Sequence, residues 1–234
     1  MGCACMDVFM LTRAKLFSIF VDANNMVGSI PSEICLLDLM QKIDWSENAF
    51  QGELPACIAS MPSLDQFDAD NNQLSGSLPT GPWPVIESLA LSNNGFSGDL
   101  SSISSMPFLR NLDVHNNEFS GGLPQHLFEK FVEKLDFSNN QLSGSLHVLF
   151  VELNGHGTLM AASTLHVLRL HDNMFQGEVV GQLFFFLGQL QELTMQGNLL
   201  TGTLDGECER SLDILTADCL HVSCACCTAC PEEH

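Results

Sequence analysis

Six cysteines gather in the last 27 residues of the chain, and their spacing allows only a few kinds of chemistry. They are Cys208, Cys219, Cys224, Cys226, Cys227 and Cys230, and the last four contain a C-x-C and a C-x-x-C interval. Cysteines at this density favour disulfides formed in an oxidising compartment. Thiolates at the same spacing can also bind zinc or another soft metal, or stay reduced. No His–Cys finger spacing accompanies them, so a disulfide-bonded cap without a metal is the preferred interpretation.

Acidic side chains form the second group. The chain has 28 Asp and Glu against 8 Lys and Arg, a formal net charge of −20, which disfavours nucleic acid and anionic membranes and favours cationic partners. Candidate ligand-binding residues recur at matching positions of a repeated phrase: Asp22, Asp44, Glu47, Asp68, Asp70, Asp113, His115, Arg169 and His171. They predict a surface for an extended or basic peptide, with pH dependence through the histidines. Calcium is an alternative, although no loop gathers the carboxylates at calcium-ligand spacing.

The repeated phrase itself predicts the elements that position these residues. LDFSNNQLSGSL at 135–146 has near copies at 67–79, 89–100 and 112–124. Each copy has an asparagine two residues before an apolar residue, and successive asparagines are 24, 24, 22, 23, 23, 33 and 25 residues apart. This ladder consists of Asn24, Asn48, Asn72, Asn94, Asn117, Asn140, Asn173 and Asn198. A fixed period in this range indicates a solenoid of stacked repeats.

Apolar residues stand eight, five and three positions before every ladder asparagine. This spacing predicts one short, half-buried strand per repeat, and the positions four, two and one before the asparagine then face away from the core. In the first three repeats these open-face positions hold five carboxylates and no cation. We expect each asparagine to satisfy buried backbone groups at the turn, which is a structural role and not a catalytic one.

The full pattern, L-x-x-L-x-L-x-x-N-x-L-S-G-x-L-P, resembles the plant-type subfamily of leucine-rich repeat proteins. MVGSIP (26–31), FQGELP (50–55), LSGSLP (74–79) and FSGGLP (119–124) match its hallmark continuation. The resemblance implies an α/β-class leucine-rich repeat solenoid: a right-handed curved superhelix with a parallel sheet on the concave face and irregular or short helical segments on the convex side. The ending, LTADC followed by C-x-C-C-x-x-C, resembles the caps of leucine-rich repeat receptor-like proteins of diatoms and related algae.

Three stretches depart from the period. We expect an irregular segment at 1–15, eight repeats over 16–207 and a cysteine-rich cap at 208–234. The longest step contains an insert within 147–164, which is either a ligand-contacting loop, as in plant-type receptors, or a passive insertion on the convex side, the preferred reading. The start shows no signal-peptide pattern, so we expect a fragment of a longer protein. Gly2 with Cys3 and Cys5 suggests lipid anchoring, which Met6 disfavours.

A binding module is the function class that these features favour. The sequence has no phosphate-binding glycine loop, kinase signature or nucleophile elbow, and no run approaching the roughly 20 apolar residues of a membrane-spanning helix. We therefore expect no enzyme and no cofactor. The resemblance implies a protein or peptide partner on the concave face of an extracellular or cell-surface receptor-like ectodomain. An intracellular scaffold, perhaps lipid-anchored, and a secreted inhibitor or cell-wall interactor are the alternatives.

Overall fold

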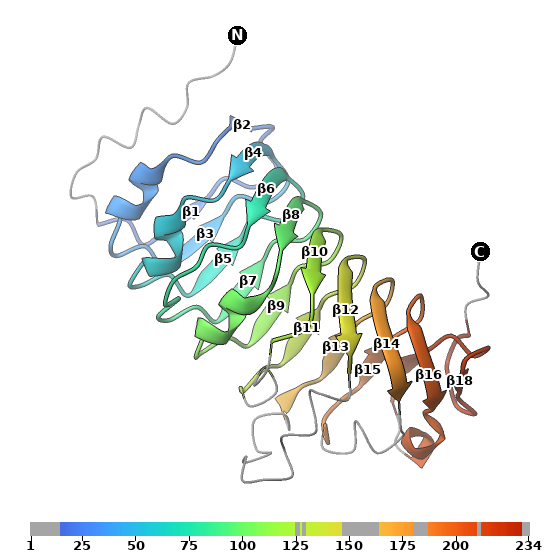
Figure 1. Cartoon of the computed structure of the whole chain (residues 1–234). Helices are drawn as coiled ribbons and strands as arrows, with labels where there is room; N and C mark the ends of the chain where they lie inside the picture. The colour runs from blue at the N-terminus through green and yellow to red at the C-terminus, as the bar shows by residue number, and fades with distance from the viewer. Residues whose placement is uncertain are drawn as a thin grey trace.

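The computed structural model describes residues 15–124, 127, 130–146, 164–179, 187–209 and 212–230. Within these residues the chain coils into stacked turns, and each turn contributes one strand to each of two parallel sheets (Figure 1). The predicted insert, apart from Thr164, and the first residues with Gly2, Cys3 and Cys5 lie outside the described residues. Among the described residues, no helix is both long and apolar enough to cross a bilayer.

One sheet, here called the odd-numbered sheet, has nine parallel strands in sequence order. They are β1 (Ser18–Phe20), β3 (Lys42–Asp44), β5 (Gln66–Asp68), β7 (Ser88–Ala90), β9 (Asn111–Asp113), β11 (Lys134–Asp136), β13 (Val167–Arg169), β15 (Glu192–Thr194) and β17 (Ile214–Thr216). This is the sheet that the sequence predicts on the concave face. Its last strand lies within the predicted cap.

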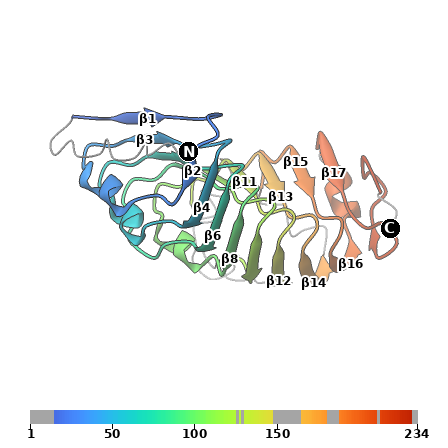
Figure 2. The ribbon, with the colours of Figure 1, turned by 90° about the horizontal axis from the view of Figure 1, so that it is seen from above.

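The other sheet, here called the even-numbered sheet, also has nine parallel strands and lies on the opposite side of the turns (Figure 2). Its strands are β2 (Val27–Gly28), β4 (Ala49–Glu53), β6 (Gln73–Ser77), β8 (Gly95–Gly98), β10 (Glu118–Gly121), β12 (Gln141–Ser145), β14 (Met174–Val179), β16 (Leu199–Thr203) and β18 (Val222–Ser223). Among the described residues, short 3-10 helices follow β2, β4, β8 and β16: η2 (Ser32–Leu36), η3 (Ala56–Ser60), η4 (Ser101–Ser105) and η8 (Asp205–Glu209). The stacked turns form the leucine-rich repeat solenoid that the periodicity predicts. The even-numbered sheet was not predicted, because the sequence indicated one strand per repeat and irregular or short helical segments on the opposite side.

The strands stack in register because one apolar position repeats in every turn. Ile43 pairs with Ile19 on one side and with Phe67 on the other, and this column continues through β17. From Ile43 to Leu215 its side chains are at most 2 % exposed. No single turn can bury its own apolar face, so each turn is stabilised by its neighbours on both sides.

Aromatic side chains fill the space between the two sheets. The rings of Phe96 and Phe119, from β8 and β10, stack with their centroids 6.1 Å apart. Trp45 meets Phe67 edge-on at 5.5 Å, and all four side chains are at most 1 % exposed. Aromatic contacts of this geometry add to the free energy gained from burial alone.

The ladder asparagines from Asn48 to Asn198 join each turn to the one before it. In Asn117, Oδ1 accepts a hydrogen bond from Phe96 N at 2.9 Å and Nδ2 donates one to Leu91 O, also at 2.9 Å. The same pair of contacts recurs at Asn48, Asn72, Asn94, Asn140, Asn173 and Asn198. Backbone groups buried at the turn therefore have partners.

Both ends of the ladder differ from its middle. Asn24 is exposed, and its Nδ2 donates only to Asp22 O in its own turn, at 2.6 Å. At the other end, Asp218 accepts hydrogen bonds from Gly197 N at 2.9 Å and from Asn198 N at 3.2 Å. A carboxylate has acceptors but no donor, so Asp218 can serve the preceding turn and ends the column.

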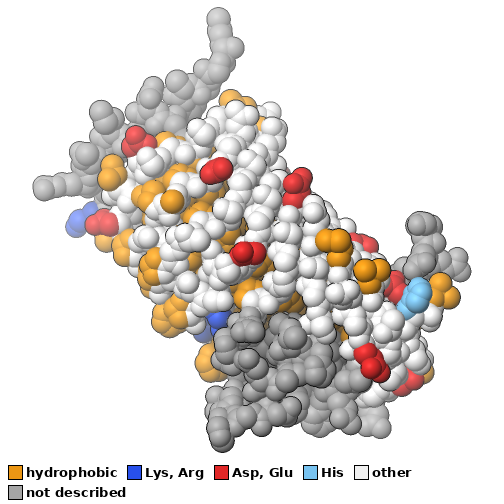
Figure 3. Space-filling model, in the orientation of Figure 1, with side chains coloured by type: hydrophobic (Ala, Val, Ile, Leu, Met, Phe, Trp, Pro, Cys, Tyr) orange, Lys and Arg blue, Asp and Glu red, His pale blue; other side chains and the backbone are white. Residues whose placement is uncertain are grey.

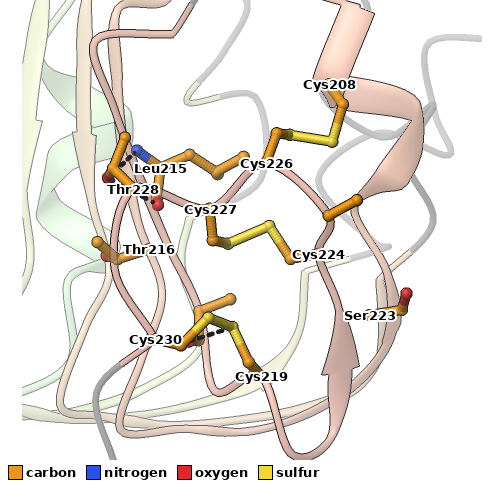
Figure 4. Close-up of a disulfide and its surroundings, with 12 residues drawn as sticks. Cys208, Leu215, Thr216, Cys219, Ser223, Cys224, Cys226, Cys227, Thr228 and Cys230 are labelled. Atoms are coloured by element: carbon orange, nitrogen blue, oxygen red, sulfur yellow. Dashed lines mark hydrogen bonds between the residues drawn. A yellow bond between two sulfur atoms is a disulfide. The ribbon is translucent and has the colours of Figure 1, made fainter.

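Four disulfides link cysteines within the described part of the solenoid. The six C-terminal cysteines pair as Cys208–Cys226, Cys219–Cys230 and Cys224–Cys227 (Figure 4). The predicted disulfide-bonded cap is thereby confirmed, and no sulfur in it is left as a thiolate ligand for a metal. Thr228 fastens this segment to the last strand of the odd-numbered sheet, because its backbone N and Oγ1 both donate to Leu215 O.

The fourth disulfide, Cys35–Cys57, was not predicted. It joins η2 to η3 in neighbouring turns, with a Cα–Cα distance of 6.0 Å. Because the two cysteines are 22 residues apart, close to one repeat period, they lie side by side once the turns stack.

Candidate functional site

The open face of the odd-numbered sheet holds most of the residues that the sequence singled out, and its two halves differ in charge. In the N-terminal half, four carboxylates lie on three neighbouring turns, and none of them forms an ion pair with another described residue. These are Asp22, Asp44, Asp68 and Asp70. Like charges on adjacent strands repel one another, so this half of the face favours a cation.

Two of these carboxylates have raised pKa values, chiefly because they are partly buried. Burial raises the pKa of Asp68; a hydrogen bond from the backbone of Asp70 opposes the rise, and the charges of Asp44, Asp113 and Asp22 add to it. Burial, followed by the charge of Asp68, raises the pKa of Asp70 to about 6, although Asp70 accepts a hydrogen bond from Ser92 N. Asp44 keeps local partners, since it accepts hydrogen bonds from Ser46 N at 3.1 Å and Ser46 Oγ at 2.7 Å.

In the C-terminal half the charges are paired. Arg169 donates to both carboxylate oxygens of Glu192, at 2.6 and 3.0 Å, and to Asp136 at 2.9 Å. Burial alone would raise the pKa of Asp136, but hydrogen bonds from Ser138 and Arg169 outweigh it and hold the pKa below its ordinary value. A carboxylate that is 3 % exposed needs such partners. Two carboxylates of the protein therefore hold the Arg169 side chain in place.

The two histidines are also hydrogen-bonded on this face. His115 Nδ1 lies 2.6 Å from Asp113 Oδ1, and the other oxygen of Asp113 accepts from Lys134 Nζ at 3.1 Å. His171 Nδ1 shares a hydrogen bond with Thr194 Oγ1 at 2.7 Å. Burial lowers the pKa of His171 despite the nearby carboxylates, which favours its neutral ring at neutral pH.

One group has the spacing of metal ligands. Single ligand atoms of Asp113, His115 and Asp136 lie within 4.8 Å of one another. Lys134 and Arg169 already pair with the two carboxylates, so positive charges of the protein itself neutralise this donor set. The chemistry of this donor set fits an internal charge network better than a calcium or zinc site.

Glu47 stands apart from the other candidates. Its backbone has φ of 53°, the left-handed conformation that Asn71, Asn93, Asn116 and Asn139 adopt at the same position of later turns. Asparagine tolerates this conformation better than glutamate does. The side chain is exposed beyond the end of β3, so Glu47 lies at the rim of the open face.

Strand alternation also places on this face a position that the sequence interpretation left out, six residues before each ladder asparagine. It holds Lys42, Lys134 and Glu192, which are the first residues of β3, β11 and β15. The expectation that the first three turns carry no cation is therefore wrong, because Lys42 lines the same hollow as Asp44 and Asp68. Successive side chains of a strand point to opposite faces, so the alternation that identified the positions four and two before each asparagine also identifies this one.

The opposite face offers a contrast. In the orientation of Figure 1 the even-numbered sheet faces the viewer, and in Figure 3 its acidic side chains are scattered singly among uncharged surface. The stacked carboxylates thus belong to the odd-numbered sheet.

The fold and the open face of the odd-numbered sheet together define the class of protein. It is a leucine-rich repeat solenoid with a disulfide-bonded cap and a polar, open sheet. The family model Leucine Rich Repeat matches residues 108–129 and 131–153. Receptor-like protein 35 of Arabidopsis thaliana is 34 % identical over 89 residues, which is 38 % of this chain and 9 % of that protein. The chain thus spans about a tenth of the length of the curated relatives it matches. These matches support a plant-type leucine-rich repeat protein.

Solved structures with the same fold include plant receptor ectodomains. The Arabidopsis receptor kinase HAESA, in complex with the peptide hormone IDA and the co-receptor SERK1, superposes with a TM-score of 0.69 at 28 % identity, over 85 % of this chain and 36 % of that one. The plant peptide hormone receptor RGFR1, in complex with RGF2, superposes with a TM-score of 0.76 at 24 % identity, over 93 % of this chain and 34 % of that one. This second likeness is one of fold alone. The chain is similar to receptor-like ectodomains.

Proposed function

We propose that this chain is part of a receptor-like ectodomain and binds an extended, basic peptide or protein segment on the open face of the odd-numbered sheet. The observation that carries the proposal is the group of four carboxylates on the first three turns, none of which forms an ion pair with a described residue. A bound Lys or Arg would relieve their mutual repulsion and add charge-assisted hydrogen bonds. The nine candidate residues named from the sequence are the proposed contacts, with Arg169 oriented by its own ion pairs.

The comparisons support the peptide part of this proposal. HAESA holds the peptide hormone IDA, and the relatives matched in sequence are receptor-like proteins. The alternating side chains of a wide parallel sheet suit an extended partner. The binding step proposed here is non-covalent and involves no catalysis and no cofactor.

An extracellular or cell-surface location is part of the proposal. Disulfides form and persist in oxidising compartments, and four of them link described residues. We further propose the division into eight repeats over 16–207 and a cap over 208–234. The cap sequence adds the resemblance to receptor-like proteins of diatoms and related algae.

Selection from a displayed library of random peptides against the disulfide-bonded protein tests the function. We expect selected peptides to be rich in Lys and Arg, to bind less tightly at higher ionic strength, and to lose affinity for the Asp44→Asn/Asp68→Asn variant. Glu118→Gln, an exposed change of charge on β10 of the even-numbered sheet, is the matched control. Selected peptides that bind this double variant as tightly as the wild type would contradict the proposed site.

A further inference from the structure

A hollow of about 150 Å³ opens on the N-terminal half of the odd-numbered sheet. It arises where long side chains stand next to short ones. Gln66 and Asp68 of β5 pair in register with Ser88 and Ala90 of β7, and the short side chains leave the space beside the longer ones unfilled. Sites for small-molecule ligands occupy roughly 300–1,000 Å³, so this hollow has the size for one side chain of a larger ligand.

The lining combines negative charge with an aromatic side chain. Asp44 and Asp68 contribute carboxylates, and Phe20 contributes a ring that is 62 % exposed to solvent. Gln66 and Ser88 add hydrogen-bonding groups. An exposed aromatic beside carboxylates offers both a face for stacking and acceptors for N–H groups.

The charges of this lining are not balanced from within. Lys42 also lines the hollow, yet it forms no ion pair within 4 Å with any described residue. Asp113 and Asp136, by contrast, are paired with Lys134 and Arg169 on later strands. The hollow is therefore a place on this face where a cation from outside finds free acceptors.

We propose that this hollow is a subsite for one arginine side chain of the ligand, with the guanidinium held by Asp44 and Asp68 and packed against Phe20. The inference rests on the proposed function and specifies which ligand residue the face selects. A guanidinium is planar, stacks on aromatic rings, binds carboxylates through two parallel hydrogen bonds and is weakly hydrated; an ammonium has only its point charge. The subsite thus prefers arginine to lysine.

A titration followed by NMR tests the subsite with the full, disulfide-bonded chain. The probe is the capped tripeptide acetyl-Gly-Arg-Gly-amide, and the same peptides with lysine or citrulline in the centre are its matched controls. We expect the arginine peptide to give saturable shifts in the amides of β1, β3, β5 and β7. The lysine peptide should bind about two- to fivefold more weakly, and the uncharged citrulline peptide should give no saturable shift.

Three variants localise the effect, and their amide spectra report at the same time that they are folded. Phe20→Ala and Asp68→Asn should each weaken the arginine peptide by about two- to fivefold. Ala90→Leu fills the hollow without changing the charge and should abolish saturable binding. Glu118→Gln, on the even-numbered sheet, should leave affinity unchanged. Arginine shifts that do not saturate, equal binding of the citrulline peptide, or an Ala90→Leu variant that binds normally would overturn the subsite.

The two proposals can fail separately. If selected library peptides lose affinity for Asp44→Asn/Asp68→Asn but bind Phe20→Ala and Ala90→Leu as tightly as the wild type, the proposed function stands and the arginine subsite is wrong. If the tripeptide binds in the hollow as described while the library yields no ligand, the subsite stands and the peptide-binding function fails.

Discussion

Removal of a central ladder asparagine should cost far more stability than removal of the first one. Asn117→Ala leaves the N–H of the fully buried Phe96 without the acceptor it has at 2.9 Å. Leu91 C=O loses one of its two donors and still accepts from Asn94 Nδ2 at 3.1 Å. A buried backbone group left unsatisfied costs about 1–3 kcal/mol, so the loss for Asn117→Ala should be about 1–3 kcal/mol. Asn24→Ala removes only an exposed contact within its own turn and should change stability by less than about 0.5 kcal/mol.

Equilibrium unfolding in urea with the disulfides intact, followed by circular dichroism, measures this difference. The free energies of unfolding are compared only between variants whose free energy falls with urea concentration at the same slope. A change in the compactness of the unfolded chain would alter that slope and could be mistaken for a change in stability. Asn117→Asp is an informative third variant, because it keeps the acceptor for Phe96 N but has no donor for Leu91 O. Equal losses for Asn117→Ala and Asn24→Ala would refute the role assigned to the ladder.

Three further predictions concern the backbone, a disulfide and a carboxylate. Glu47→Asn should raise stability by about 1 kcal/mol, since the left-handed backbone at φ of 53° suits asparagine better; a lower melting temperature would contradict this. Cys35→Ala/Cys57→Ala removes the disulfide between η2 and η3 and should lower the free energy of unfolding in urea by about 3 kcal/mol. An unchanged unfolding midpoint would show that this disulfide does not stabilise the protein. Asp70→Asn should be more stable than the wild type at pH 7.5 and lose that advantage toward pH 4. The pKa of Asp70 is raised from 3.8 to about 6, so the ionised carboxylate destabilises the folded protein above that pH. The wild type therefore gains stability as the pH falls through 6. A stability advantage of Asp70→Asn that does not depend on pH would exclude this explanation.

The repeat period was enough to predict the solenoid and its core. Apolar side chains at fixed distances before Asn72, Asn94 and Asn117 can be buried together only if successive turns stack in register. The in-register column from Ile43 to Leu215 shows this burial directly. The cap could be predicted from cysteine density, although not its pairing, because many connectivities satisfy one sequence.

Side-chain partners between turns were harder to predict. The role of Arg169 depends on Asp136 and Glu192, which lie 33 and 23 residues away and meet it only after two neighbouring strands have paired. Lys42 was missed because the first position of each strand was left out of the open face, although strand alternation includes it. Cys35 and Cys57 are about one repeat apart, a spacing that points to contact between neighbouring turns.

Hydrogen–deuterium exchange of the chain with and without a selected basic peptide tests the central claim most directly. The claim is that the ligand lies on the odd-numbered sheet over its uncompensated carboxylates. It predicts that the peptide slows exchange in β3, β5 and β7 and in the residues that follow each of them, including Asp70. Slowed exchange confined to the even-numbered sheet or to the disulfide-bonded cap would contradict it.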